Sequence, residues 1–122
     1  MKRLSLVAVA MALACPAWAA DKAADPMLKL ASTSGCMTCH QVEPGGKGPD
    51  GLPPIGPAWK DVSAKYKSQK GAADTLAKIV QTGSNPYESH WKGKVSGLAM
   101  PPNKVAISEA DTKKLVAWIL KL

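Results

Sequence analysis

Five consecutive residues, Cys36-Met37-Thr38-Cys39-His40, combine two thiols and an imidazole within a short stretch of backbone. The pattern C-x-x-C-H is typical of covalent haem c attachment. Two thiols three residues apart can each add to one vinyl group of the same porphyrin, and the next residue can bring its imidazole to the iron. The sequence therefore predicts one haem c, with Cys36 and Cys39 as thioethers and His40 as the proximal iron ligand.

Three other uses of these residues are weaker. A thioredoxin-like redox pair needs a βαβ context, which the helical pattern of the chain does not provide. A Cys2His2 zinc site would need Cys36, Cys39, His40 and His90, with adjacent Cys39 and His40 strained toward one tetrahedral metal and without the usual spacing. A disulfide between the two cysteines would close a loop too small to stabilise the domain much. We therefore favour haem attachment.

The second axial ligand decides what such a haem does, and Met100 is the best candidate. It lies sixty residues after His40, between Gly97-Leu98-Ala99 and Pro101-Pro102. An irregular, proline-stiffened segment can hold a thioether at a fixed place without helical constraints. Ligation by His40 and Met100 would fill both axial positions and raise the reduction potential, which is typical of an electron carrier.

The other candidate ligands fit less well. Met37 lies within the attachment motif and cannot reach the opposite face of a haem, while Met27 precedes the motif in a predicted helix, where a core position is natural. His90, in a polar stretch, is the rival for the sixth position. Met100 as a residue that merely packs in the core is the remaining alternative.

The rest of the chain is predicted to form helices, which would position these residues. The predicted fold class is therefore all-α. Asp25 and Ser108 are suitable N-caps, and Gly83 is a suitable C-terminal stop. No stretch alternates as a half-buried strand would. The predicted helices cover residues 25–34, 58–67, 72–82 and 108–122.

A loop is predicted between the motif and the second helix. Residues 44–57 contain five prolines and five glycines among fourteen residues, which no helix or central strand can hold. Lys47 lies among these glycines, but the full pattern of a phosphate-binding loop is missing. We expect a long surface loop without nucleotide binding.

The N-terminus has the pattern of a signal peptide. Lys2 and Arg3 precede eleven apolar residues (4–14), and Ala17-Trp18-Ala19 is a small-residue cleavage site. Eleven residues at about 1.5 Å each cannot span a hydrocarbon core of about 30 Å. We therefore predict a cleaved signal peptide over residues 1–19 and a monohaem domain over residues 20–122.

The size and charge of the chain limit its function. The 122 residues suffice for one domain, with no Phe, two Tyr and four Trp to fill its core. The formal net charge of +7 falls to +5 when two basic residues leave with the signal peptide. Export argues against nucleic acid as a partner, whereas a positive carrier would meet acidic protein surfaces quickly. The lysines that could form a basic rim are Lys47, Lys60, Lys65, Lys67, Lys70, Lys92, Lys94 and Lys104.

With these residues in view, the chain resembles the class I c-type cytochromes, specifically the small bacterial cytochrome c-551/c-552 type. The resemblance implies four to five short helices around one covalently bound haem, with the first and last helices packed near each other. It also implies the ligand pair His40 and Met100. The segments that carry it are GCMTCH (35–40), GPAWKDVSAKY (56–66), TGS (82–84), MPPN (100–103) and AWIL (117–120).

The resemblance also implies roles for three further residues. Pro57 would accept the proximal imidazole N–H through its carbonyl, Asn103 would hydrogen-bond near the methionine sulfur, and Trp91 would donate to a haem propionate. Compared with short members of the family, this chain is extended in segments 44–57 and 92–99. These extensions would reshape the rim of the haem site.

Together, these observations predict a non-enzymatic electron carrier of a bacterial respiratory chain. We expect a periplasmic monomer that exchanges single electrons with redox proteins that present acidic surfaces, and whose mature form does not insert into membranes. A dedicated haem subunit of a periplasmic dehydrogenase is the main alternative. An enzyme or gas sensor in which Met100 leaves the iron is a further one.

Overall fold

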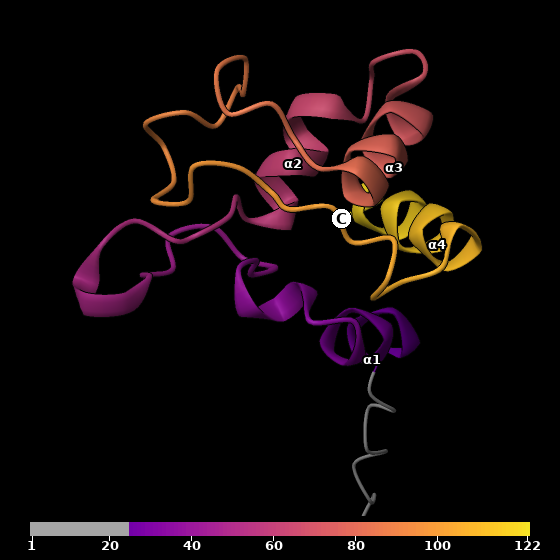
Figure 1. Cartoon of the computed structure of the whole chain (residues 1–122), viewed down its shortest axis with the longest axis horizontal. Coiled ribbons are helices and arrows are strands. Elements are labelled where there is room, and N and C mark those ends of the chain that lie inside the picture. The colour runs from indigo at the N-terminus through magenta and orange to yellow at the C-terminus, as the bar shows by residue number, and fades with distance from the viewer. Residues whose placement is uncertain (1–24) are drawn as a thin grey trace, which may run out of the picture.

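The structure is a computed structural model that describes residues 25–122 (Figure 1). This part of the chain contains α1 (Pro26–Thr33), α2 (Trp59–Tyr66), α3 (Ala72–Thr82) and α4 (Glu109–Ile119), with 3-10 turns η1 (Cys36–Thr38) and η2 (Pro49–Gly51). Within residues 25–122 there is no strand, only an isolated bridge between Lys92 and Val95. The predicted all-α class is confirmed. The predicted signal peptide lies outside the described residues.

The helix ends follow local capping chemistry. Asp25 Oδ1 accepts a hydrogen bond from Met27 N at 2.8 Å, with Pro26 at the first helical position. Ser108 Oγ accepts from Asp111 N at 3.1 Å, and Gly83 ends α3 at a φ of 87°, where only glycine is unstrained. The predicted boundaries are confirmed to within a few residues. The largest difference is at the C-terminus, where α4 stops at Ile119 instead of continuing to residue 122.

Helix α4 is the centre of the fold, because α1, α2 and α3 all contact it. The first and last helices pack together, as the resemblance implies, and a hydrogen bond of 2.9 Å joins Trp118 Nε1 to Asp25 Oδ2. Trp118 also meets Trp59 edge to face, with ring centroids 5.8 Å apart. The buried core cluster contains Ala31, Trp59, Val62, Ile107, Leu115 and Ile119.

This core is thin for a domain of its length. The largest side chains with less than 2% of their surface exposed are Thr112 and Ser63, both of them small and polar. Several larger apolar residues that contact the core, among them Leu76, Val80 and Trp91, are only partly buried. The protein side chains alone therefore leave a hollow between the helices and the loops.

Long loops occupy the side of the molecule opposite α1 and α4. Segment 44–57 is a loop interrupted only by the short turn η2 (Figure 1), so the predicted loop is confirmed. No helix in residues 25–122 has the length and apolar character needed to cross a membrane.

Candidate functional site

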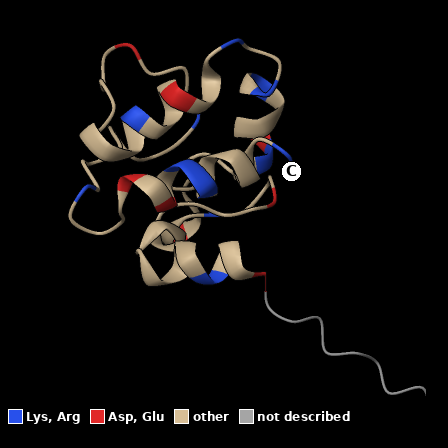
Figure 2. Cartoon of the chain, turned by 90° about the vertical axis from the view of Figure 1, so that its right-hand side faces the viewer, with Lys and Arg blue, Asp and Glu red and all other residues tan. Residues whose placement is uncertain are grey.

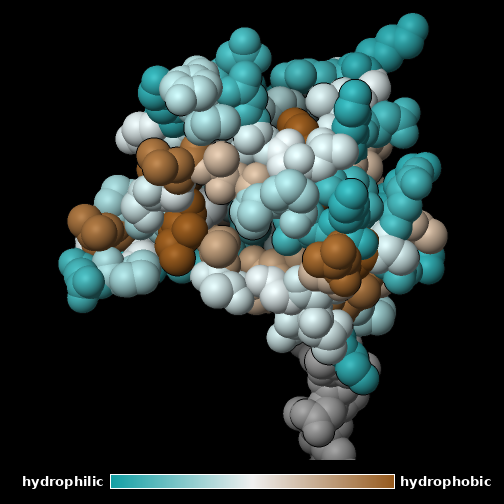
Figure 3. All heavy atoms as spheres, in the orientation of Figure 1, coloured by the Kyte–Doolittle hydropathy of each residue, from teal (hydrophilic) through white to brown (hydrophobic). Residues whose placement is uncertain are grey.

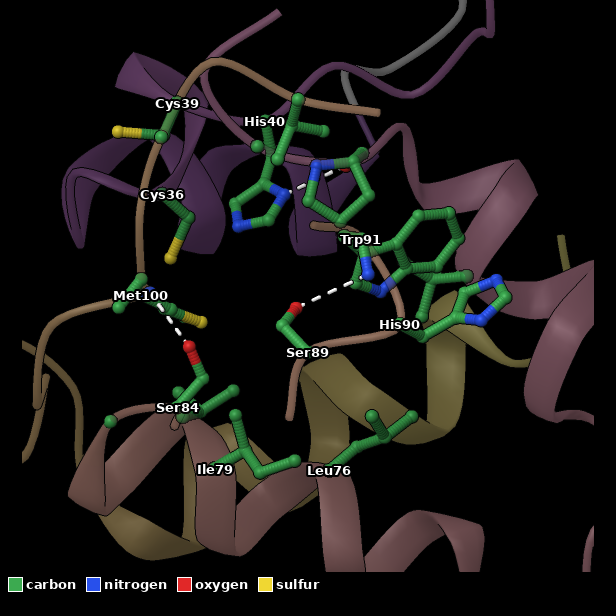
Figure 4. A pocket seen from close by; sticks show the side chains of 18 of the residues that line it. Cys36, Cys39, His40, Leu76, Ile79, Ser84, Ser89, His90, Trp91 and Met100 are labelled. Atoms are coloured by element: carbon green, nitrogen blue, oxygen red, sulfur yellow. Dashed lines mark hydrogen bonds between the residues drawn. The ribbon is translucent and has the colours of Figure 1, made fainter. Parts of the chain in front are cut away.

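A cavity of about 410 Å³ lies between the helices and the loops, and it brings together Cys36, Cys39, His40 and Met100 (Figure 4). Its volume is within the range of about 300–1,000 Å³ typical of cofactor sites. Helices α2, α3 and α4 supply most of its apolar wall. That wall contains Val62, Leu76, Ile79, Val80, Leu115, Val116 and Ile119.

His40 is held on one wall of the cavity by its ring nitrogen Nδ1, which lies 2.8 Å from the carbonyl oxygen of Pro57. A carbonyl can only accept, so Nδ1 carries the proton and Nε2 keeps its lone pair. Burial lowers the pKa of His40, and the bond to Pro57 only partly opposes this. The imidazole is therefore neutral at neutral pH, as a metal ligand must be.

The two thiols lie beside this imidazole on one turn of backbone. The amides of Cys39 and His40 both donate to the Cys36 carbonyl, at 3.3 and 3.1 Å. The chain enters this turn at Gly35, whose φ of 76° is unstrained only for glycine. Both cysteines are free thiols, so the disulfide alternative is wrong for this structure. Burial raises the pKa of Cys36, which keeps its thiol protonated.

Met100 reaches the cavity from a different wall, and its backbone is fixed by Ser84. Met100 N donates to Ser84 Oγ at 2.8 Å, while Ser84 N donates to the Met100 carbonyl at 2.9 Å. Figure 4 shows the thioether and the His40 ring both projecting into the cavity. The role of Ser84 was not predicted, although the residue directly follows the helix-ending Gly83 and belongs to the segment TGS (82–84) that carries the family resemblance.

Gly83 itself is required by close packing against the methionine segment. A Cβ at this position would lie 3.1 Å from the Met100 carbonyl oxygen and 3.1 Å from Pro102 Cδ. Its left-handed φ of 87° adds a second reason for glycine. The segment that carries Met100 therefore packs directly against the end of α3.

The rival ligand His90 is also among the residues that line the cavity, but its ring nitrogen interacts with another side chain. Its Nε2 lies 3.1 Å from Lys94 Nζ, its side chain is exposed, and its ring meets Trp91 edge to face at 4.8 Å. Within residues 25–122, no three His, Cys, Asp or Glu side chains are placed to hold a metal ion. The zinc alternative through His90 is therefore wrong for this structure.

Trp91 and Asn103 are the two remaining predicted site residues. Trp91 lines the cavity, half-buried, and its backbone N donates to Ser89 Oγ at 3.2 Å. Asn103 does not line the cavity: its Nδ2 donates to the carbonyls of Pro101 at 2.6 Å and Val80 at 3.4 Å. It thus ties the segment after Met100 to α3. The roles of both residues toward a haem stay predictions.

The donor set and the wall fit a haem c. Two free thiols, a neutral imidazole with its Nε2 unprotonated and a thioether belong to residues that line one cavity with an apolar wall. Covalent haem needs the thiols, and its iron needs the two axial donors. The cavity also lies where the protein core is thinnest, so a flat apolar group would complete the packing.

Comparison with known proteins gives a consistent result. The family model described as Cytochrome c matches residues 28–122. The chain is 36% identical over 117 residues to a cytochrome c-551 of Pseudomonas aeruginosa, covering 96% of this chain and 91% of that protein. It is 40% identical over 93 residues to a cytochrome c-552 of Nitrosomonas europaea, covering 76% of this chain and 75% of that one.

Solved structures agree with the sequence comparison. The crystal structure of wild-type Nitrosomonas europaea cytochrome c552 superposes with a TM-score of 0.60 at 39% identity. The match covers 78% of this chain and 98% of that chain.

Proposed function

The chain belongs to the cytochrome c family and carries one covalently attached haem c, and on this premise we propose that it carries single electrons between redox proteins of a bacterial respiratory chain. Homologues of this kind transfer electrons. We place the carrier in the periplasm, after removal of residues 1–19 as a signal peptide, and we take it to be a non-enzymatic monomer.

The observation that carries the proposal is that His40 and Met100, each held by hydrogen bonds, line one cavity where they would serve as the two ligands of a haem iron. The Pro57 carbonyl orients His40, and Ser84 holds the backbone of Met100 at both its N–H and its carbonyl. The bound haem supplies the one-electron couple. Because the chain holds both ligands in place, the site needs little rearrangement when it gains or loses an electron. With both ligands bound, the iron would have no free position for a substrate. Both properties favour electron transfer over catalysis.

We assign the individual roles as follows. Cys36 and Cys39 form the thioethers, His40 is the proximal ligand and Met100 the distal ligand. Trp91, on the cavity wall, is the candidate donor to a propionate. The described geometry supports Pro57 as the residue that orients the proximal imidazole.

Optical spectra of the purified protein test this proposal. We expect a low-spin ferric spectrum with the weak sulfur-to-iron charge-transfer band and a ferrous spectrum that carbon monoxide does not change. The reason is that Met100 keeps the sixth position in both oxidation states. A high-spin ferric spectrum, or ready binding of carbon monoxide, would show an open iron and redirect the search to catalysis or gas sensing.

The proposed partners are redox proteins with acidic surfaces. The mature chain would carry a formal charge of +5 without the haem propionates. Figure 2 shows lysines on several helices and loops with acidic residues among them. One candidate of the predicted rim, Lys60, is paired with Glu43 at 2.6 Å. The remaining candidates are exposed.

Exposed apolar groups are a second feature of the surface. Figure 3 shows hydrophobic residues on the loop side of the molecule, at the left of the view, and a second group at the lower right near α1. Among the exposed large apolar residues, Leu52 and Leu98 belong to the loops 44–57 and 85–99. A small exposed apolar area suits a short-lived electron-transfer complex.

Salt dependence tests the electrostatic part of this proposal. We expect the second-order rate constant for electron transfer to an acidic redox protein to fall about tenfold or more as ionic strength rises from 0.01 to 1 M, because added salt screens attraction between opposite charges. Stopped-flow measurement against a basic redox protein is the matched control, and its rate should rise or stay constant. Equal rates at low and high salt with the acidic protein would contradict electrostatic steering.

A further inference from the structure

Two loops that are far apart in the sequence are joined by backbone hydrogen bonds. Ser96 N donates to the Pro54 carbonyl at 3.0 Å, and Gly97 N donates to the Ile55 carbonyl at 3.0 Å. Ser96 Oγ adds a longer contact to the same Pro54 carbonyl at 3.4 Å. The proline- and glycine-rich loop is therefore attached to the segment that leads into Met100.

The next two residues of the first loop are bonded to the opposite side of the site. Gly56 N donates to the Cys39 carbonyl at 2.8 Å, and the Pro57 carbonyl lies 2.8 Å from His40 Nδ1. Gly56 is also buried against the imidazole, since a Cβ there would lie 2.8 Å from His40 Cε1. Residues 54–57 therefore contact both sides of the site. Residues 54 and 55 bond to the segment that leads into Met100, and residues 56 and 57 bond to the Cys39 carbonyl and to His40.

The methionine segment is held at two points. Ser96 and Gly97 anchor it to residues 54 and 55, and three residues later the Met100 backbone is bonded to Ser84. Pro101 and Pro102 restrict the chain beyond this point. Each anchor therefore limits how far the Met100 thioether can move from its place in the cavity.

We propose that residues 54–57 act as one strut that sets the position of the Met100 segment relative to His40. The proposal rests on the proposed function, in which these two residues are the axial ligands. It makes Pro54, Ile55 and Gly97 positioning residues for the distal ligand, although none of them is itself a ligand. Loss of the bonds between the two loops should weaken Met100 ligation while the thioethers and His40 stay in place.

A substitution at Gly97 can test the contact between the two loops. A Cβ at position 97 would lie 2.5 Å from the Ile55 carbonyl oxygen, which is backbone and cannot turn aside as a flexible side chain would. The φ angle of Gly97 is not in the left-handed region. Alanine at this position is therefore compatible with the local backbone, and its main effect is to push the two loops apart.

The matched test compares Gly97→Ala with Ser96→Ala in the haem-loaded protein. Imidazole added to the ferric protein competes with Met100, and loss of the charge-transfer band reports the competition. We expect Gly97→Ala to bind imidazole about tenfold more tightly than wild type, because it loses one or two backbone hydrogen bonds that favour the Met100-bound state. Ser96→Ala loses only the long Oγ contact and should stay within about twofold. Equal affinities for Gly97→Ala and wild type would overturn the proposal.

A second measurement needs no variant. By hydrogen exchange in the wild-type ferric protein, the amides of Ser96 and Gly97 should exchange about tenfold or more slowly than that of Gly93, which has no backbone acceptor among residues 25–122. Saturating imidazole should accelerate the exchange of Ser96 and Gly97, because the coupling is reciprocal. Exchange at the rate of Gly93 would exclude the strut. A wild-type spectrum without the charge-transfer band would instead show that the proposed ligand set has failed.

Discussion

Without haem, the mature chain is expected not to fold cooperatively. The cavity of about 410 Å³ lies between α2, α3, α4 and the methionine segment, where a core would otherwise be. Without haem, the apolar wall of this cavity would face water, which costs roughly 25 cal/mol for each Å² of apolar surface left uncovered. A domain has a total stability of only about 5–15 kcal/mol. Collapse onto the cavity cannot recover much of this cost, because the chain has no Phe and few other large side chains to fill it.

The measurement is circular dichroism of residues 20–122 produced with Cys36→Ala and Cys39→Ala and freed of haem. We expect weak helical signal, no near-ultraviolet tryptophan signal and no sharp thermal transition. The same variant with haem added back is the control, and it should regain helical signal because His40 and Met100 can still bind the iron. A sharp unfolding transition in the haem-free chain would contradict this expectation.

The helices could be predicted from sequence because their ends are determined locally. Asp25 and Ser108 cap helices within three residues of themselves, and Gly83 ends α3 by its own backbone conformation. Such signals can be recognised from a few neighbouring residues in the sequence. The premature end of α4 was not predictable in the same way. The apolar stripe continues to Leu122, but the last residues turn back toward Ser63 Oγ, which donates to the Leu120 carbonyl at 3.2 Å.

The candidate site could be predicted only where neighbouring residues in the sequence form a recognisable motif. Cys36, Cys39 and His40 form a contiguous motif, and Met100 is marked by the prolines after it. The partners that hold these residues lie far along the chain: Ser84 is 16 residues from Met100, and Gly97 pairs with Ile55. Bonds between loops without periodic sequence leave no pattern to find. The role of Asn103 was inferred from resemblance, whereas the structure shows its amide on two backbone carbonyls.

Replacement of Met100 by alanine should change both the spectrum and the reduction potential of the site. The thioether is the donor assigned to the sixth position, and the methyl group of an alanine has no lone pair to offer the iron. We expect the charge-transfer band to disappear and the ferrous protein to bind carbon monoxide. Since a Met ligand raises the potential of a haem, the reduction potential should fall by on the order of 0.1 V or more.

Met27→Leu is the matched control, because Met27 packs against the core and does not line the cavity. It should leave the spectrum and the potential unchanged. His90→Ala separates the remaining alternative: His90 interacts with Lys94 and Trp91, so its removal should not alter the axial ligands. If Met100→Ala kept a low-spin spectrum that only the further change His90→Ala abolished, His90 would have to swing away from Lys94 to reach the iron. The loop that carries His90 could then move far enough to let His90 replace Met100 at the iron. In the wild-type protein, the two anchors of the Met100 segment would keep Met100 bound and so prevent this exchange.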